Sequence, residues 1–292
     1  MLELRNVVKI YGKNVRAVDD VSLDLPSGVV GLIGHNGAGK TTLMQMIATI
    51  AKPTSGQILL DGVDIVKQPE LMRARLGFLP QEFGVYPNLS ALEFMQYFAA
   101  LKGVRDPARI RHLLGLVNLH DHAHRQAAGF SGGMKRRLGI AQALLNDPDV
   151  LVVDEPTAGL DPEERLRFRH LLSEIGLRKL VLLSTHIVSD IENMAGRLAV
   201  MNQGRLVACD TPDSFVQRAR SQVWSVTVNT ADYETLSAGL QVLQAQRHTH
   251  GVTLRIAHPS APLSGAVPAE PTLEEALMTQ RYAVRDQLDQ AA

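Results

Sequence analysis

Cysteine is nearly absent from this 292-residue chain, since Cys209 is the only one. An intrachain disulfide needs two cysteines and a cysteine-based zinc site needs more, so both are excluded, and a reducing compartment such as the cytosol is expected. Apolar runs are short as well, and none approaches the ~20 residues that span a bilayer. The N-terminal segment MLELRNVVKI lacks the unbroken apolar core of a signal peptide. We therefore expect a cytoplasmic protein that meets a membrane only through a partner.

An excess of either charge is also missing, because 30 Lys and Arg residues balance 30 Asp and Glu residues. Such a chain has no net field that attracts nucleic acid or anionic lipid, so direct nucleic-acid binding is not expected. What the chain does have is 45% hydrophobic residues, enough for a sizeable core and too many for wholesale disorder. Its length suits one large domain, or one large and one small domain.

Strand-like and helix-like segments alternate through most of the chain, which is typical of an α/β protein with a largely parallel sheet. Strands are predicted at 2–11, 17–25, 29–34, 57–62, 76–81, 150–155 and 179–185, and 198–210 resembles a hairpin. Helices are predicted at 40–50 and 69–76, from Pro162 onward, and near Asp190. Residues from about 90 to 146 show only helical spacing and predict an all-helical insert.

The pattern changes beyond residue 220, so we expect one domain over 1–220 and a small accessory domain over 221–292. Two strands around a helical stretch are predicted within 222–258, which indicates an α+β fold, and a proline-rich spacer follows. Thr272 and Glu275 form a capping-box pattern that predicts a short final helix. A frayed tail is expected after Tyr282.

A glycine-rich stretch, GHNGAGKTT, stands between a predicted strand and a predicted helix. Gly34, Gly39, Lys40 and Thr41 fit the pattern G-x-x-x-x-G-K-[ST] of a phosphate-binding loop. A triphosphate needs several backbone N–H groups turned inward, a path that glycine tolerates, and the N-terminus of the following helix adds partial positive charge. Lys40 can reach the β- and γ-phosphates, and the Thr41 hydroxyl can bind Mg²⁺. The other loop residues expected to contact the nucleotide are Asn36, Gly37, Ala38 and Thr42.

Two acidic residues, Asp154 and Glu155, stand at the end of the apolar strand VLVV. Ligands bind at the C-terminal ends of the strands in α/β sheets. Asp154 is suited to binding Mg²⁺, and Glu155 is placed to polarise a water molecule. An acidic pair at a strand end, in the same chain as a phosphate loop, predicts a nucleoside triphosphatase.

From about Leu2 to Pro212, the ordered series of motifs resembles the ATP-binding cassette (ABC) ATPases. FSGGMKRR, which begins at Phe130, resembles the family signature, and AGLD, which ends at Asp161, resembles the loop that crosses the dimer. The resemblance implies a P-loop nucleoside triphosphatase core with a parallel sheet, an antiparallel β subdomain and an all-helical insert. It also implies ATP and Mg²⁺ as cofactors.

The same resemblance implies roles for single residues. Glu155 would be the general base, and His186 and Lys40 would stabilise charge on the transferring phosphoryl group. Tyr11 would stack on adenine, and Gln81 would link the helical insert to the metal.

SGG at a predicted helix start, formed by Ser131, Gly132 and Gly133, is a second anion-binding motif, in which Ser131 offers a hydroxyl and Gly133 an open backbone N–H. It lies at the opposite end of the insert from the phosphate loop, so one chain cannot easily bring both motifs to one nucleotide. Two copies arranged head to tail would complete each other's sites. The resemblance implies such a homodimer, with ATP held between the subunits.

The signature departs from the commonest form, because Phe130 and Met134 stand where Leu and Gln are usual. Met134 cannot donate a hydrogen bond as Gln can, and our hypothesis is that backbone N–H groups and Ser131 suffice. Met134, followed by Lys135 and Arg136, is similar to the subgroup of ABC ATPases that serves two-component exporters with a separate permease. The chain is therefore interpreted as the ATPase subunit of an exporter, peripheral on the inner face of the cell membrane through its permease.

Aromatic residues are concentrated in one segment, where Phe78, Phe83, Tyr86, Phe94, Tyr97 and Phe98 occur. The core of the helical insert explains Phe94 and Phe98. Phe83 and Tyr86 fall in a loop flanked by Pro, Gly and Asn, and exposed apolar groups often mark a protein partner. For these two we favour a permease docking surface.

Two local clusters invite other readings. His112, His120, His122 and His124 suggest metal binding, but only His120 and His124 share a helical face, so this reading is not favoured. The run from Lys135 to Arg137 suggests nucleic acid, but a solvated face or an interface is preferred.

A different function class is a soluble ABC ATPase that acts on a ribosome or on DNA. Translation-type members resemble two cassettes in one chain, whereas this chain has one. Chromosome-type members carry a long coiled coil, and the interval from Lys40 to Asp154 has no sustained heptads. Both features favour transport. The C-terminal domain remains open as a regulatory ligand binder or a brace for the dimer, either of which is compatible with transport.

Overall fold

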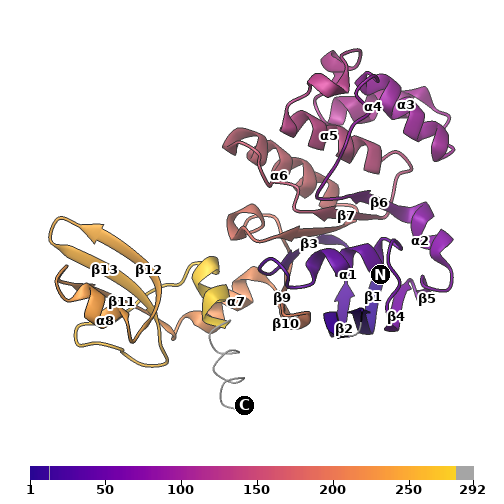
Figure 1. The fold of residues 1–292 in the computed structure, drawn as a ribbon. Coiled ribbons are helices and arrows are strands. Elements are labelled where there is room, and N and C mark those ends of the chain that lie inside the picture. The colour runs from indigo at the N-terminus through magenta and orange to yellow at the C-terminus, as the bar shows by residue number, and fades with distance from the viewer. Residues whose placement is uncertain (13, 281–292) are drawn as a thin grey trace. The chain divides into compact units, whose positions relative to one another are not determined.

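The computed structural model describes residues 1–12 and 14–280 (Figure 1), so the tail predicted after Tyr282 lies outside the described residues. The chain divides into two units, Met1–Cys209 and Asp210–Ala292. The division precedes helix α7 (Pro212–Ala219), a segment that the sequence assigned to the first domain. No helix of the described residues is long and apolar enough to cross a membrane.

A six-stranded sheet forms the centre of the first unit, in the order β10-β9-β3-β8-β7-β6. Its strands are β3 (Gly28–Ile33), β6 (Leu76–Leu79), β7 (Val150–Asp154), β8 (Leu180–Thr185), β9 (Arg197–Asn202) and β10 (Arg205–Asp210). The pairs β9–β3, β3–β8, β8–β7 and β7–β6 are parallel, as predicted. In this register Ile33 lies opposite Thr185, and Asp154 opposite Ser184. The carboxyl ends of three neighbouring strands therefore meet at one edge.

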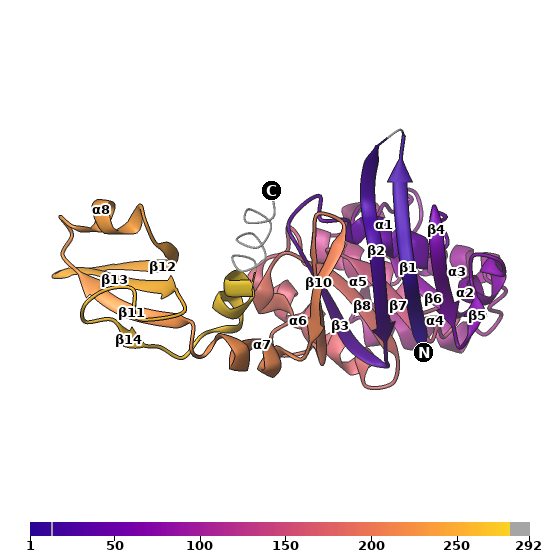
Figure 2. The same ribbon diagram turned by 90° about the horizontal axis from the view of Figure 1, so that it is seen from below.

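A second, antiparallel sheet has the order β2-β1-β4-β5. Its strands are β1 (Leu2–Tyr11), β2 (Val15–Leu25), β4 (Ser55–Leu60) and β5 (Val63–Asp64), and Figure 2 shows the first three running alongside one another. Helix α1 (Lys40–Ile47) contributes Met44 and Ile47 to a buried cluster that also contains Leu4 of β1 and Leu32 of β3. The helix behind the phosphate loop is thus anchored between the two sheets by apolar packing. Helix α2 (Pro69–Arg75) leads into β6.

Between β6 and β7, in residues 80–149, the elements are helical, and the predicted insert is confirmed. They are α3 (Ala91–Leu101), α4 (Pro107–Leu116), α5 (Gly132–Ala143) and the 3-10 turns η1 (His120–His122) and η2 (Ala127–Gly129). Side chains cap the three longer helices: Ser90 with Glu93 forms a capping box on α3, Asp106 caps α4 and Ser131 caps α5. Each cap accepts a hydrogen bond from an N–H group that the helix itself cannot satisfy.

Helix α6 (Pro162–Gly176) joins β7 to β8 and begins at Pro162 as predicted. The helix predicted near Asp190 is wrong in extent, because only the 3-10 turn η3 (Val188–Asp190) forms there. After this turn, single helical hydrogen bonds join Glu192 N–H to the Val188 carbonyl oxygen (3.1 Å) and Ala195 N–H to the Ile191 carbonyl oxygen (2.9 Å), but they do not continue into a helix before β9 begins at Arg197.

In the second unit, helix α7 precedes a four-stranded antiparallel sheet in the order β12-β13-β11-β14. Its strands are β11 (Val223–Val228), β12 (Gln241–His248), β13 (Gly251–Ala257) and β14 (Val267–Pro268). The helical stretch predicted between the two sequence-predicted strands is wrong in extent: α8 covers only Tyr233–Ser237, and β12 follows it. Most side chains of β12 are exposed, so the strand lacks the apolar alternation that would have revealed it.

The core of this sheet contains Val226, Leu254 and Ile256. Residues 273–280 are helical, and the predicted capping box is confirmed. Glu275 N–H donates to Thr272 Oγ1 (3.2 Å), and Thr272 N–H donates to Glu275 Oε2 (2.8 Å).

Candidate active site

The phosphate loop connects β3 to α1, and its glycines are required by close contacts and by backbone geometry. Gly39 is the N-cap of α1 with φ 97°, and a Cβ there would lie 2.2 Å from the Ala17 carbonyl oxygen. A Cβ on Gly34 would lie 2.6 Å from the Met201 carbonyl oxygen. Gly37 has φ 83°, again in the left-handed region that favours glycine. Any larger residue at Gly34 or Gly39 would displace the loop from the sheet edge.

Lys40, the first residue of α1, is 4% exposed and turns back onto its own loop. Its Nζ donates to the carbonyl oxygens of Gly34 (2.7 Å) and His35 (3.1 Å) and lies 3.7 Å from Glu155 Oε1. Thr41, the next residue, is exposed at the N-terminal end of α1. Of the other predicted loop residues, Asn36 and Gly37 are exposed, Thr42 is half-buried and Ala38 is buried.

The two acidic residues lie at the end of β7, as predicted, and both are buried: Asp154 is 1% exposed and Glu155 8%. The Ser184 hydroxyl donates to Asp154 Oδ1 and accepts a hydrogen bond from Glu155 N–H (2.9 Å). Glu155 has φ 43°, a conformation that costs free energy for a residue with a side chain. His186, just after β8, places Nδ1 3.2 Å from Glu155 Oε1.

The structure therefore brings together Lys40, Glu155 and His186, which follow three neighbouring strands. Burying a charge costs free energy, and such charges are often found at functional sites. A buried carboxylate beside one ammonium and one imidazole is therefore a candidate active site. A water molecule at Glu155 could lose a proton to the carboxylate, while Lys40 and His186 face the charge that forms during phosphoryl transfer.

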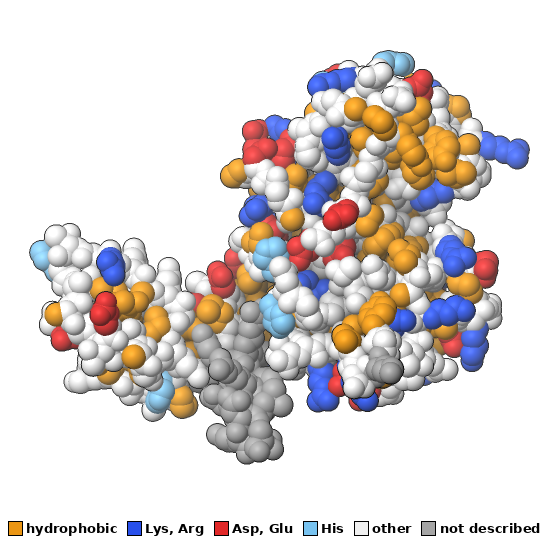
Figure 3. All heavy atoms as spheres, in the orientation of Figure 1, with side chains coloured by type: hydrophobic (Ala, Val, Ile, Leu, Met, Phe, Trp, Pro, Cys, Tyr) orange, Lys and Arg blue, Asp and Glu red, His pale blue; other side chains and the backbone are white. Residues whose placement is uncertain are grey.

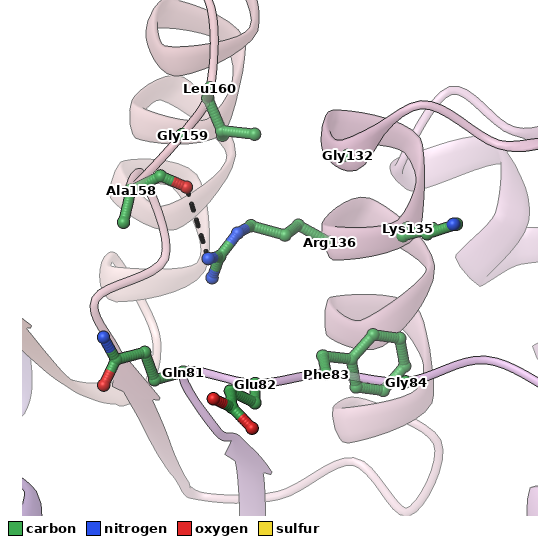
Figure 4. Close-up of a pocket in the computed structure, with 10 residues that line it drawn as sticks. All are labelled: Gln81, Glu82, Phe83, Gly84, Gly132, Lys135, Arg136, Ala158, Gly159 and Leu160. Atoms are coloured by element: carbon green, nitrogen blue, oxygen red, sulfur yellow. Dashed lines mark hydrogen bonds between the residues drawn. The ribbon is translucent and has the colours of Figure 1, made fainter.

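Gln81 and Gly132 line a different cavity, of about 590 Å³ (Figure 4). Its lining comes from the loop after β6, from the start of α5 and from residues 158–160 before α6. Figure 4 shows Arg136 extending across this cavity toward the Ala158 carbonyl oxygen, to which it donates (3.3 Å). The residues of the phosphate loop do not line the cavity. Gln81 and Gly132 thus line one cavity from two different elements, on opposite sides of it in Figure 4.

The signature residues occupy the first turn of α5. Ser131 is exposed and its hydroxyl accepts a hydrogen bond from Met134 N–H (3.2 Å). Gly132 is exposed, with no atom within 4 Å of an added Cβ, so its backbone is open. The open backbone predicted at Gly133 is wrong, because Gly133 is buried and a Cβ there would lie 2.5 Å from Glu164 Oε2. This glycine lets α5 pack closely on α6.

Two predicted residues are placed by other elements. Tyr11 ends β1 and is 41% exposed, with Lys9 Nζ 4.9 Å from the ring centroid. Its ring therefore retains exposed surface for stacking. Asp161 is the N-cap of α6 and its Oδ1 accepts a hydrogen bond from Glu164 N–H (2.9 Å).

Two residues of the basic run after the signature, Arg136 and Arg137, do not lie on a solvated face, which was one of the two interpretations that the sequence left open. Arg137 is buried, donates to the Val117 carbonyl oxygen (2.9 Å) and places Nε 3.1 Å from Glu164 Oε2. Arg136 is half-buried, and burial lowers the pKa of its guanidinium while the charge of Glu155 opposes that shift. Both side chains bind parts of the same chain.

Three polar residues near the acidic pair were missed by the sequence analysis: Thr157, Ser184 and Asp190, all at most 2% exposed. The sequence carries only a weak indication of these residues. Ser184 is one of two hydroxyl residues that end the apolar strand LVLLST, and Asp190 is an acidic residue four positions after His186. The histidines at positions 112, 120, 122 and 124 do not form a metal-ligating group in residues 1–12 and 14–280.

Oxygen donors at the start of α1, at the end of β7 and in the loop after β6 fit a magnesium ion. Mg²⁺ prefers oxygen ligands and is commonly held by one or two carboxylates together with substrate phosphates. Thr41 offers an exposed hydroxyl, Asp154 a carboxylate at the strand end, and Gln81 an exposed amide oxygen. A glycine loop that opens helix α1, an acidic strand end and an inserted helical segment together define a P-loop ATPase of the cassette type.

Comparison with known proteins agrees with this class. A family model described as ABC transporter matches residues 18–158. The ABC transporter ATP-binding protein NatA of Bacillus subtilis (strain 168) is 38% identical over 216 residues, which are 72% of this chain and 88% of that protein. A Nod factor export ATP-binding protein I of Cupriavidus metallidurans is 38% identical over 221 residues, covering 74% of this chain and 73% of that protein.

An import protein is similar to the same degree. The methionine import ATP-binding protein MetN of Corynebacterium efficiens is 38% identical over 222 residues, which are 70% of this chain and 61% of that protein. Among solved structures, a dimeric post-hydrolysis state of an ATP-binding cassette bound to ADP and Pi matches with a TM-score of 0.66 and 26% identity, covering 72% of this chain and 98% of that one. The chain belongs to the ATP-binding subunits of ABC transporters, which are ATPases.

Proposed function

We propose that the chain is the ATPase subunit of a two-component exporter, and that it drives a separate permease by ATP-dependent head-to-tail dimerisation. The observation that carries the proposal is the separation of two anion-binding motifs within one chain. Lys40, Glu155 and His186 lie together at one sheet edge, whereas Gly132 lines a cavity without the phosphate loop.

Hydrolysis would take place at the sheet edge. Glu155 is proposed as the general base, and Lys40 and His186 as the groups that stabilise charge on the transferring phosphoryl group. Thr41, Asp154 and Gln81 would hold Mg²⁺, which neutralises phosphate charge when it is bound. Tyr11 would stack on adenine with the exposed part of its ring.

The second copy would complete this site. Ser131 and Gly132 are exposed at the N-terminal end of α5, where the helix carries partial positive charge and its open backbone can approach a phosphate. Asp161, exposed at the start of α6, belongs to the loop proposed to cross the interface. An isologous pair of chains would then bind two ATP molecules between them. The dimeric cassette structure similar to this chain supports this arrangement.

The permease would dock on an aromatic surface beside α3, formed by Phe83, Tyr86 and Tyr97. Tyr86 is 49% exposed and Tyr97 45% exposed, and their rings pack together at 5.5 Å between centroids. Phe83 is half-buried, with its ring edge against Phe94 (6.0 Å between centroids). Figure 3 shows hydrophobic side chains gathered on this part of the surface. Exposed aromatic groups in one patch are typical of a protein partner site.

Export is favoured by the signature, where Met134 and Lys135 stand as in the two-component exporter subgroup, and by the similarity to the Nod factor export protein. Docking on the permease would hold the chain at the inner face of the cell membrane.

Co-expression with a permease identified among the neighbouring reading frames tests the docking. The Phe83→Ala, Tyr86→Ala double variant is expected to remain in the supernatant when permease-containing membranes are sedimented, and to keep its ATP binding. Leu177→Ala is the matched control, because Leu177 is also an exposed apolar residue (83%) but lies at the C-terminal end of α6 and is not part of the aromatic surface. Sedimentation of the double variant equal to wild type would contradict the docking surface. Capture of ribosomes or DNA instead of permease would contradict the transport function.

A further inference from the structure

A buried hydrogen bond joins two loops of the candidate active site at residues that have no assigned role. Thr157, two residues after Glu155, donates from Oγ1 to Asp190 Oδ2 (2.5 Å). Thr157 is 2% exposed and Asp190 1%. A hydrogen bond to an ionised group in a buried setting is stronger than one in water, so this contact fixes geometry.

The second oxygen of the same carboxylate is held loosely. Asp190 Oδ1 lies 3.7 Å from Arg165 Nε, and both atoms are buried without a hydrogen bond among the described residues. The Arg165 side chain is 31% exposed, so its charge is partly screened. The contact that determines the position of Asp190 is therefore the one from Thr157.

This contact is one of three links between the loop after β7 and the segment formed by the end of β8 and the loop that follows it. Ser184 accepts from Glu155 N–H (2.9 Å), and His186 Nδ1 lies 3.2 Å from Glu155 Oε1. The Thr157–Asp190 link lies beyond His186, so the histidine is held between a link on each side.

Without the outer link, the His186 loop would still be held by Thr185, whose Oγ1 accepts from Ile187 N–H (2.9 Å), and by Arg169, which donates to the Ser189 carbonyl oxygen (2.6 Å). Its buried link to the loop after β7 beyond His186 would be lost.

We propose that Asp190, through Thr157, is a positioning residue for the reaction, which keeps His186 in register with Glu155. The inference rests on the proposed roles of Glu155 and His186. Thr157 and Asp190 are at most 2% exposed, so we expect their loss to reduce the rate of the chemical step and to leave nucleotide binding unchanged. A misplacement of about 1 Å in an active site can cost about 100-fold in rate.

The test is steady-state ATPase kinetics on the full-length chain. Thr157→Val, which keeps the shape and removes the donor, is expected to lower kcat by about tenfold or more with the KM for ATP unchanged. Thr157→Ser restores the hydroxyl and should recover most of the activity. Asp190→Ala should match Thr157→Val, and the double variant should be no worse than either single variant, because both remove one contact.

Asp190→Asn separates the hydrogen bond from the charge, since its carbonyl oxygen can still accept from Thr157. It should keep most of the wild-type kcat. Thr227→Val is the matched control, because it removes a hydroxyl contact (2.9 Å to Thr253 Oγ1) in the second unit and should leave kcat unchanged.

Activity is expressed per ATP-binding site, titrated with a fluorescent ATP analogue, so that a loss of folded protein is not counted as a loss of rate. Wild-type kcat per site in Thr157→Val would overturn the inference, as would a Thr157→Ser variant no more active than Thr157→Val. Glu155→Gln in the same assay distinguishes a failure of the proposed catalytic role from a failure of the proposed positioning role. If that variant keeps turnover, the proposed catalytic role fails. If it loses turnover while Thr157→Val does not, only the positioning role fails.

Discussion

The two units of the chain bury charge in different ways. In the second unit the buried charge of the described residues is Glu275, and its partners account for it: Arg255 donates twice to the carboxylate (2.6 Å each) and Thr272 N–H donates once (2.8 Å). In the first unit Lys40 and Glu155 are buried 3.7 Å apart.

The difference indicates where the chemistry lies. A paired and capped carboxylate such as Glu275 serves the fold, because it closes a capping box and covers the sheet. Charges gathered at a strand end beside a strained backbone are not needed by the core, which apolar residues would fill at lower cost. Substitutions at the two kinds of buried charge should therefore have different effects, on catalysis in one case and on stability in the other.

The largest effect is expected at Glu155. Glu155→Gln removes the proposed general base and should lower kcat about 10²–10⁴-fold while ATP binding is kept. Glu275→Gln is the matched control in the other unit and should leave kcat unchanged. Steady-state ATPase rates and equilibrium ATP binding on both variants make the comparison. Hydrolysis near the wild-type rate in Glu155→Gln would remove Glu155 from this role.

A structural buried charge also exists in the first unit, at Arg137. Arg137→Met leaves Glu164 without its buried partner and should lower the free energy of unfolding of this unit by about 3 kcal/mol. Urea unfolding followed by far-UV circular dichroism measures the loss. Arg167→Ala is the control, because Arg167 is exposed on α6 and its ion pairs should contribute less than about 1 kcal/mol. An equal loss of unfolding free energy in the two variants would contradict the expected difference between the buried and the exposed ion pairs.

The stability of the second unit should depend on pH through Glu275. Burial acts to raise the pKa of this carboxyl, but the hydrogen bonds from Arg255 and Thr272 outweigh it, and the pKa is lowered overall. A carboxyl with a lowered folded pKa stabilises the fold above the ordinary Glu value, about 4.3, and this stability is lost as pH falls through the folded pKa.

Trp224, the only tryptophan, lies in β11 of this unit, so its fluorescence reports on the second unit alone. Unfolding transitions should weaken as pH falls below about 4.3, and Glu275→Gln should flatten that dependence. An unaltered pH profile in the variant would show that other groups are responsible.

The smallest effect is expected at Met134. Its N–H already donates to Ser131, and this bond does not depend on the side chain. Met134→Gln should therefore change the ATPase rate by less than about twofold, a difference below 0.5 kcal/mol. A severalfold increase would mean that the missing amide limits hydrolysis.

Local patterns predicted the parts of the site that local chemistry determines. The spacing of Gly34 and Gly39 before Lys40 indicated the loop, and the apolar run before Asp154 indicated the strand end. The helical insert followed from its periodicity. These features depend on residues that are close in sequence, so steric requirements and burial are visible in the local residue pattern.

Features that depend on tertiary contacts were not predictable. Thr157 and Asp190 are 33 residues apart, and nothing in either segment indicates that they meet. Arginine is usually a surface residue, and Arg137 is buried only because α5 packs on α6, where it pairs with Glu164. Strand β12 was missed because most of its side chains are exposed, which leaves no alternation to read.

The central claim is that two chains enclose ATP at a shared interface and separate after hydrolysis. Analytical ultracentrifugation of the Glu155→Gln variant tests it, because that variant should bind ATP without consuming it. With ATP and Mg²⁺ the account predicts a species of about twice the 31.9 kDa chain mass, and with ADP a monomer. A strictly monomeric variant in saturating ATP, at high protein concentration and with the permease present, would contradict it.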